Sequence, residues 1–291
     1  MFKKVMPFFL SMLLVVSILP IVAYADAAVG DVIVTLGEDL TEDQKQKLLE
    51  EMEAPKDVMT VPVTNEEEHQ YLGDYISKAL IGTRALSSSS ITIAKKDAGL
   101  SVETNNINWV TDDMYANALI TAGVKDADIY VTAPTEVSGT AALTGLIKAY
   151  ELSSDEVIPE EQKQVANEEL VTTAKLSDSI GADKATELMT KIKDDIATNP
   201  PETEEDLRER IKQIASDSGI ELTGEELDGL VALFNRMKNL DIDWDQMKGQ
   251  LENARENLDE FLNKEETQSF IQKIIDFFIA LIDGIKGVFK S

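Results

Sequence analysis

Hydrophobic positions in residues 31–152 alternate between short β-branched runs and longer amphipathic segments. This alternation is typical of an α/β domain in which helices cover a mixed sheet. Two further runs flank the turn-rich residues 95–99 and predict a hairpin, one at residues 90–94 and the other at residues 100–104. We therefore expect five or six strands in this half. The strands expected to precede helices are residues 32–36, 58–63, 107–110 and 129–132.

Threonines mark the starts of several predicted helices. Thr41, Thr64 and Thr223 each begin a Thr-x-x-Gln/Glu sequence, the capping box that satisfies free amides in a first helical turn. The first two predict helices that extend to about residues 52 and 77, and the third predicts a helix that ends near residue 240.

Two more helices are predicted in the N-terminal half. Thr111 precedes one of them, and Asp112 and Asp113 suit the positive end of its dipole. The other covers about residues 138–151 and carries small side chains three or four positions apart, which allow close packing on a sheet. These small residues are Ala142, Gly145 and Ala149.

From about residue 153 the strand pattern ends and the apolar spacing becomes helical, as at Leu207, Ile211 and Ile214. Pro159 suits a helix start, and two adjacent prolines at 200–201 mark a break. We therefore expect an α/β domain followed by an all-α helical domain. The expected boundaries are residues 1–25, 26–152, 153–265 and 266–291.

The N-terminus has the pattern of a signal peptide. Lys3 and Lys4 precede an apolar stretch, which ends in small residues at Ala23 and Ala25. This pattern predicts export and cleavage after Ala25, hence a secreted or extracytoplasmic protein. An uncleaved membrane anchor is the alternative, and it fits the short apolar stretch less well.

Charge restricts the function further. The 291 residues include 54 acidic and 27 basic side chains, a formal net charge of −27. A chain this acidic repels phosphate backbones, which excludes nucleic-acid binding through counterion release. The absence of cysteine excludes disulfides and thiolate zinc sites, and the single histidine excludes a His-rich metal site. We expect no cofactor.

His69 and Ser87 are the weak candidates for catalysis. His69 shares a helical face with Leu72 and Ile76, so it is either a histidine at the core edge or a general base. Ser87 begins a run of four serines, which suits either a nucleophile or a solvated turn before an edge strand. The Gly-x-Ser-x-Gly nucleophile motif is absent from the sequence.

Two segments are candidates for binding an anionic ligand. Arg84 is a cation between a predicted helix and the predicted hairpin, and an internal ion pair is the alternative to a ligand. Ser138, Gly139 and Thr140 follow a strand and open a helix, where free amides attract anions. An ordinary helix cap explains the same three residues.

Asp241, Asp243, Asp245 and Glu252 have the carboxylate spacing of a calcium loop. Gln246 occupies the position where the sharp turn needs glycine, and a lysine occupies a normally apolar position. A run of aspartates that caps the next helix is the alternative. Weak binding of divalent cations is the most that this pattern predicts.

Residues 270–289 predict an amphipathic helix with a broad apolar stripe, too often interrupted by aspartates to span a bilayer. The stripe suits a membrane surface or a partner protein, and docking on the protein's own helical half is the alternative. Its members are Ile271, Ile274, Ile275, Phe278, Ile282, Ile285 and Phe289.

Four segments of the chain carry a family resemblance. They are DAAVGDVIVTLG at residues 26–37, IGTRALSSSSITIA at 81–94, YVTAPTEVSGTAALTG at 130–145 and MKNLDIDW at 237–244. These segments resemble the YpuA-like family of exported Gram-positive proteins. The resemblance implies an extracytoplasmic address, and it supplies neither an activity nor catalytic residues.

The sequence therefore favours an exported, non-catalytic protein of the cell envelope that associates with a membrane or partner through its last helix. One alternative is a hydrolase-like envelope enzyme that uses the loops at Arg84, Ser87–Ser90 and Ser138–Thr140. Another is a calcium-dependent surface module.

Overall fold

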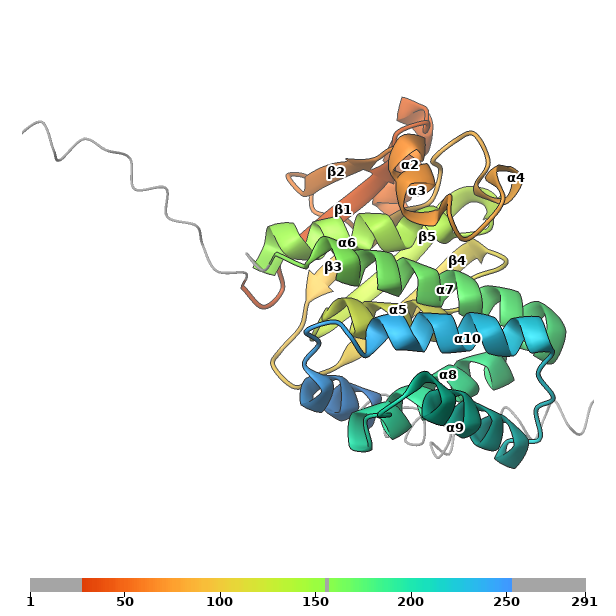
Figure 1. Ribbon diagram of the computed structural model, residues 1–291. Coiled ribbons are helices and arrows are strands. Elements are labelled where there is room, and N and C mark those ends of the chain that lie inside the picture. The colour runs from red at the N-terminus through yellow and green to blue at the C-terminus, as the bar shows by residue number, and fades with distance from the viewer. Residues whose placement is uncertain (1–27, 155–156, 253–291) are drawn as a thin grey trace, which may run out of the picture.

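The computed structural model describes residues 28–154 and 157–252 of the chain. An N-terminal mixed sheet with helices is followed by a helical region, so the predicted fold class is confirmed (Figure 1). The strands are β1 (Val32–Gly37), β2 (Met59–Val63), β3 (Ser88–Ile93), β4 (Leu100–Ile107) and β5 (Ala127–Val137). The helices before residue 155 are α2 (Glu42–Glu51), α3 (Asn65–Leu72), α4 (Lys78–Ile81), α5 (Asp112–Ala122) and α6 (Thr140–Ser154). Those that follow are α7 (Glu160–Ile180), α8 (Ala182–Thr198), α9 (Glu204–Asp217) and α10 (Gly224–Met237).

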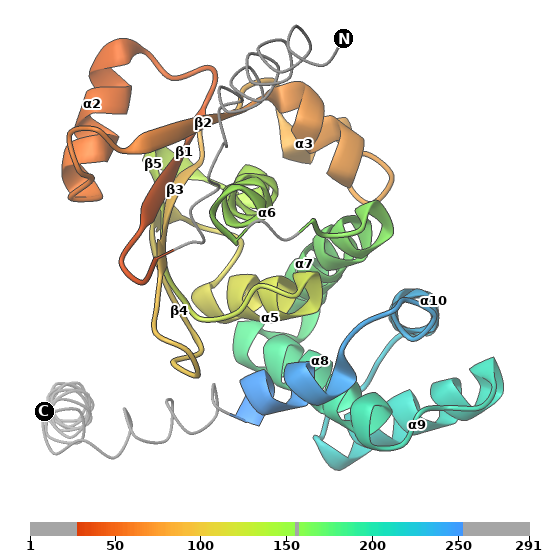
Figure 2. The same cartoon turned by 90° about the vertical axis from the view of Figure 1, so that its left-hand side faces the viewer.

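The sheet has the strand order β2-β1-β3-β5-β4. Its β1–β2 and β4–β5 pairs are parallel, whereas β3 pairs antiparallel with both of its neighbours. Ile33, Ile91 and Ile129 lie side by side on β1, β3 and β5 and belong to the core that α5 and α6 cover. Val34 belongs to a second cluster with Leu48 of α2, which lies on the opposite side of the sheet (Figure 2).

The predicted hairpin at residues 90–104 is wrong, because β5 lies between β3 and β4. The chain does turn there, and Gly99 has a positive φ of 77°. The start of β5 fits between the two strands: the Ala94 amide donates to the Asp126 carbonyl, and the Ala127 amide donates to the Gly99 carbonyl, both at 3.0 Å. Local turn composition predicts a reversal but not which strand fills the gap.

The two strands expected at residues 100–104 and 107–110 form one strand with its continuing loop. β4 runs to Ile107, with an irregularity in its pairing to β5 between Asn105 and Ile107. Asn106 has a φ of 59°, and its side-chain amide donates to the Ala133 carbonyl at 2.8 Å. This bulge interrupts the alternation of apolar and polar residues, so the sequence shows two short runs where the structure has one strand.

The three predicted capping boxes are confirmed at Thr41, Thr64 and Thr223. In each, threonine Oγ1 accepts a hydrogen bond from the backbone amide three residues later, at 3.1–3.3 Å. The helix that begins after Thr64 ends at Leu72 instead of near residue 77, and the short α4 follows it.

Gly145 allows α6 to approach the sheet, as the stripe of small residues predicts. A Cβ atom at this position would lie 2.8 Å from both Thr35 Oγ1 and Val63 Cγ2. Ala142 and Ala149 of the same stripe are buried in the core. The stripe is therefore a packing feature of the α6–sheet contact.

Helix α7 contributes to both cores of the molecule. Ala166, Leu170 and Ala174 belong to the cluster with the sheet, α5 and α6. Val165 and Leu176 belong to the cluster formed by α8, α9 and α10. Packing is therefore continuous across the boundary near residue 153, and the division into separate domains there stays a prediction.

A buried ion pair joins α5, α7 and α8. Lys193 of α8 and Glu169 of α7 are 0% and 1% exposed, and Lys193 Nζ donates to Glu169 Oε1 at 2.7 Å. Lys193 Nζ also donates to the Asn117 carbonyl of α5 at 3.0 Å, and the Thr121 hydroxyl donates to the same Glu169 side chain. Burial lowers the pKa of Lys193, and the carboxylate of Glu169 opposes that shift.

Candidate functional site

His69 lies on α3 at the edge of a small core. Its Nε2 is 3.3 Å from the Gly82 carbonyl, and its buried Nδ1 has no hydrogen-bond partner in the part of the chain that the structure describes. Leu72 at the end of α3 and Ile76 in the turn that follows are buried with Val171 of α7, so the single helical face predicted for His69, Leu72 and Ile76 is wrong although both apolar side chains are buried. This geometry agrees with the packed histidine that the sequence offered as one interpretation.

The expectation of a solvated turn at Ser87–Ser90 is wrong. Ser87 is buried, and Ser88, Ser89 and Ser90 belong to β3, the central strand of the sheet. Ser89 Oγ lies 2.7 Å from Thr35 Oγ1 on the neighbouring strand. The Ser89 hydroxyl therefore has its hydrogen-bond partner inside the sheet. Short polar side chains also suit the close approach of α6.

No hydrogen bond or ion pair between described residues links Arg84 or the start of α6 to Ser87–Ser90. Arg84 is exposed on the loop before β3, and no ion pair joins it to a described residue. At Gly139 (φ 91°) a Cβ would lie 2.5 Å from both Tyr115 Oη and Ile107 Cγ2. Ser138 Oγ and Thr140 Oγ1 are 3.3 Å apart, so these hydroxyls serve the turn into α6.

The aspartate run after α10 caps a helix, as the alternative interpretation predicts. Asp243 Oδ1 accepts a hydrogen bond from the Gln246 amide at 2.9 Å, and residues 244–252 are helical. Trp244 packs against the helical core. Within residues 28–154 and 157–252, no group of three or more His, Asp or Glu side chains is arranged to hold a metal ion.

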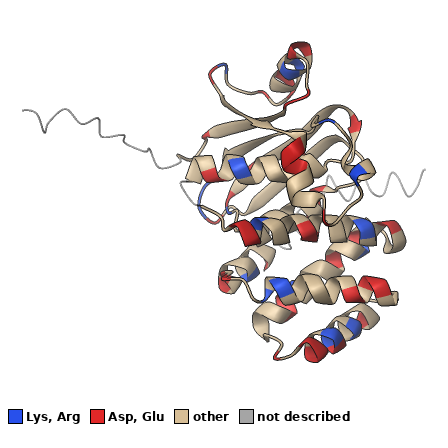
Figure 3. Ribbon diagram, turned by 45° about the horizontal axis from the view of Figure 1, so that its top comes forward, with Lys and Arg blue, Asp and Glu red and all other residues tan. Residues whose placement is uncertain are grey.

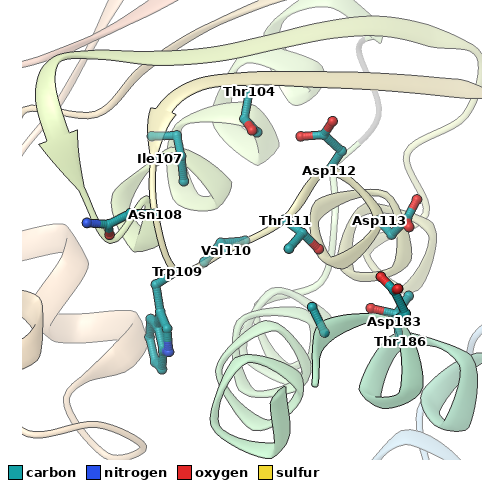
Figure 4. A pocket seen from close by; sticks show the side chains of 11 residues that line it. Thr104, Ile107, Asn108, Trp109, Val110, Thr111, Asp112, Asp113, Asp183 and Thr186 are labelled. Atoms are coloured by element: carbon teal, nitrogen blue, oxygen red, sulfur yellow. The ribbon is translucent and has the colours of Figure 1, made fainter. Parts of the chain in front are cut away.

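A cavity of about 400 Å³ lies where the β4–α5 connection meets the start of α8 (Figure 4). Its wall combines apolar side chains with three carboxylates and a threonine from α8. None of the catalytic or anion-site candidates from the sequence lines it. The lining residues are Thr104, Ile107, Asn108, Trp109, Val110, Thr111, Asp112, Asp113, Ala182, Asp183 and Thr186.

Local structure explains how the acidic residues reach this cavity. Thr111 Oγ1 accepts a hydrogen bond from the Met114 amide at 3.4 Å and thereby starts α5, so Asp112 and Asp113 occupy its first turn. Asp183 occupies the first turn of α8, which follows α7 after one glycine. Both helices present acidic side chains at their positive ends, where the dipoles favour negative charge.

The carboxylates give the cavity a strongly negative character. Partial burial raises the pKa of Asp113, and the charges of Asp112 and Asp183 raise it further. No Lys, Arg or His lines the cavity. On the helices elsewhere in the molecule, acidic and basic residues occur close to one another (Figure 3). The absence of basic residues from the described lining is therefore specific to this cavity.

Thr186 has an unsatisfied hydroxyl in this wall. The residue is 9% exposed, and its buried Oγ1 has no hydrogen-bond partner. A buried hydroxyl without a partner costs about 1–3 kcal/mol, so Thr186 is a local destabilising feature of this wall.

The sequence pattern did not point to this site. In the sequence, Asp112 and Asp113 indicate only a favourable interaction with a helix dipole, and Trp109, Asp183 and Thr186 carry no motif. The nearest signal is the acidic pair directly after a strand. Its partners on α8 lie about 70 positions later, and only the packing of α8 beside α5 brings them together.

Other predicted features lie outside the described residues. They include the signal peptide at residues 1–25 and the amphipathic stripe within residues 270–289. In residues 28–154 and 157–252, no helix is long and apolar enough to cross a membrane.

Comparison with known proteins places the chain in a family. Residues 36–254 match the family described as "Protein of unknown function (DUF1002)". The chain is 56% identical to "Uncharacterized protein YpuA" of Bacillus subtilis (strain 168), over 99% of this chain and 100% of that protein. No solved structure matches it. The chain therefore belongs to the DUF1002 family, whose YpuA-like segments the sequence displays.

Proposed function

We propose that this protein is an exported, non-catalytic component of the Gram-positive cell envelope. Residues 1–25 support export through two lysines, an apolar stretch and the Ala-x-Ala end. The Bacillus subtilis relative matches over 99% of this chain, so its similarity includes most of that segment.

The engagement of the candidate nucleophiles in internal contacts carries the non-catalytic part of the proposal. A catalytic hydroxyl lies open to substrate and within reach of a base. Ser87 is instead buried, Ser89 hydrogen-bonds Thr35 within the sheet, and Ser138 hydrogen-bonds Thr140 at the start of α6. The Nε2 of His69 faces the Gly82 carbonyl and not a hydroxyl.

The proposal assigns association with a membrane surface or a partner to residues 270–289. The support is the apolar stripe, which includes Phe278 and Phe289, together with the basic residues Lys273, Lys286 and Lys290 within and directly after it. The strongly acidic body repels anionic lipid, so attachment rests on insertion of apolar side chains.

Cell fractionation tests export and attachment together. The full-length protein and a version that ends before Phe270 are expressed in a Gram-positive host, and medium, wall and membrane fractions are compared by immunoblot. We expect both proteins outside the cytoplasm with Asp26 as the first residue, and only the full-length protein in the membrane or a large complex. Retention of Met1 on the exported protein, or equal distribution of the two versions, contradicts the proposal.

A substrate screen tests the absence of catalysis. Purified protein is assayed against ester, peptide, glycoside and phosphate substrates beside the His69→Ala variant. We expect no turnover that depends on His69, because its Nε2 faces the Gly82 carbonyl and its Nδ1 has no hydrogen-bond partner among the described residues. A hydrolytic activity that disappears in a folded His69→Ala variant overturns this part.

A further inference from the structure

The loop at residues 82–86 joins α4 to β3 and is held to the β1–α2 connection by a pair of hydrogen bonds. The Ala85 amide donates to Asp39 Oδ2 at 2.8 Å, and the Asp39 amide donates to the Ala85 carbonyl at 3.2 Å. Ala85 is fully buried, whereas Thr83 and Arg84 are exposed. The buried part of the loop therefore closes on Asp39.

The other end of the loop is suited to be a hinge. Gly82 has a φ of 84°, and its carbonyl lies 3.3 Å from His69 Nε2. Glycine changes its backbone angles at little steric cost. At the closed end, a Cβ atom on Gly37 would lie 2.3 Å from the Ala85 carbonyl oxygen. The closed position therefore depends on close backbone contact and on the hydrogen bonds between Asp39 and Ala85.

Glu68 of α3 places a second carboxyl group near Asp39. Its side chain is buried at 3% exposure, and its Oε2 accepts a hydrogen bond from Asn65 Nδ2 at 2.9 Å. Burial, and to a smaller extent the charge of Asp39, raises the pKa of Glu68 to about 7, and the Asn65 hydrogen bond opposes this shift. The same aspartate thus holds the loop and repels an ionised Glu68.

The charged groups on the helices that pack against α3 do not compensate this charge. On α6, Lys148 Nζ pairs with Glu67 at 2.6 Å. On α7, Glu160 is exposed and accepts a hydrogen bond from the Tyr71 hydroxyl. Lys78 of α4 is exposed as well.

Ionisation of Glu68 is therefore unfavourable while the loop is closed. Within residues 28–154 and 157–252, no basic side chain forms an ion pair with it. A buried carboxylate without a cation is costly, and a second carboxylate nearby adds to the cost. Separation of the loop and Asp39 from α3 relieves both effects, because it lets water reach Glu68.

We propose that ionisation of Glu68 releases residues 82–86 from Asp39, so that the loop is closed in acidic surroundings and opens toward neutral pH. Opening exposes Ala85 beside Arg84, which is already at the surface. An exported protein meets the pH of its surroundings, so the loop gives it a pH-sensitive surface. That role rests on the proposed export, whereas the opening is a property of the purified chain.

The size of the response follows from the protonation of Glu68 in the two positions of the loop. In the open loop its pKa returns to the ordinary value of 4.5, whereas in the closed loop it is about 7. The ratio of open to closed loop therefore rises about tenfold for each pH unit between these values and levels off above 7. Between pH 5 and pH 8 this ratio should increase about 70-fold.

Hydrogen exchange of the purified mature chain, followed by mass spectrometry, tests the proposal. Each rate is divided by the chemical exchange rate at the same pH. We expect exchange in residues 82–86 to accelerate about 70-fold between pH 5 and pH 8. At pH 8, about 1 M urea should change it less than about twofold, because a local opening exposes little surface, whereas exchange through global unfolding accelerates about tenfold or more.

Matched variants identify the group that titrates. Glu68→Gln removes the ionisation and keeps an acceptor for Asn65, so exchange of the loop should change less than about threefold between the two pH values. His69→Gln alters the neighbouring titratable residue and should keep the increase of about 70-fold. Asp39→Asn keeps an acceptor for the Ala85 amide and removes the repelling charge, so its increase should be smaller than that of the original protein.

Four results overturn the proposal. They are an increase of less than about threefold in the original protein, a full increase in Glu68→Gln, loss of the increase in His69→Gln, and acceleration of loop exchange by urea to the extent seen for strands β3 and β5. The last result would show that Glu68 changes only the global stability and does not control the loop.

Discussion

Replacing Lys193 by methionine tests how strongly the buried ion pair holds α5, α7 and α8 together. Lys193 is fully buried and reaches the Glu169 carboxylate, the Asn117 carbonyl and the Thr121 hydroxyl. Methionine fills a similar volume but carries no charge and donates no hydrogen bond. Glu169 would then remain as a buried carboxylate with Thr121 as its described hydrogen-bond donor.

The expected cost follows from that uncompensated charge. Removing one partner of a buried ion pair destabilises a protein by about 3–5 kcal/mol. In a protein of this size, each kcal/mol lowers the Tm by about 2–4 °C. Lys193→Met should therefore lower the Tm by about 6–20 °C.

A second variant separates the charge effect from packing. Lys193→Met/Glu169→Leu replaces both ions by apolar side chains and leaves no buried charge. We expect this double variant to recover most of the stability, because an apolar replacement of a buried pair is often neutral or stabilising. Lys191→Met is the surface control, because its ion pair with Glu187 is exposed and should contribute less than about 1 kcal/mol.

Urea unfolding monitored by circular dichroism supplies the free energies, and the double-mutant cycle supplies the coupling energy. A Lys193→Met variant within about 1 kcal/mol of the original protein would refute the reasoning. A double variant less stable than Lys193→Met would refute it too, because the loss would then come from packing and not from the unpaired carboxylate.

Three further predictions address other parts of the fold. Burial, and to a smaller extent the charge of Asp39, raises the pKa of Glu68 to about 7. The contribution of Glu68 to the free energy of unfolding is therefore complete below about pH 4.5 and is lost as the pH rises through 7. Glu68→Gln should gain about 2.5 kcal/mol relative to the original protein between pH 5 and pH 8 in urea unfolding, and a pH-independent difference contradicts this. Gly145→Ala should cost about 1–3 kcal/mol of stability through overpacking against the sheet. In the control Gly229→Ala in α10, the added Cβ meets no described atom within 4 Å, so this variant should be more stable by about 0.5–1 kcal/mol. Equal effects in thermal melts would show that the close approach of α6 is wrong. Asp243→Ala should cost about 1 kcal/mol of stability because it removes a helix cap. Calcium should not raise the Tm of the original protein. Stoichiometric calcium binding that depends on Asp243 in calorimetry would contradict the capping role.

Features that depend on a few neighbouring residues could be predicted from the sequence. A capping box needs only a threonine and a Glu or Gln three positions later, so the helix starts at Thr41, Thr64 and Thr223 were correct. The periods of the apolar pattern distinguished the sheet-containing half from the helical half. The small side chain at Gly145 indicated a close helix–sheet contact because the absence of a Cβ has few other uses in a helix.

Strand order needed the tertiary structure. Residues 95–99 have the composition of a turn whether or not another strand lies between the arms, so the sequence suggested a hairpin. For the same reason Ser88–Ser90 looked like the approach to an edge strand. Only the pairing of β3 with both β1 and β5 explains why these serines are buried.

The acidic cavity was decided entirely by packing between distant segments. Asp112 and Asp113 belong to α5, whereas Asp183 and Thr186 belong to α8, and no local pattern relates the two helices. Local interactions specify where each helix begins, because the groups that cap it are near in sequence. Which helices meet depends on the joint burial of their apolar faces, and the polar groups that share a cavity are a consequence of that burial.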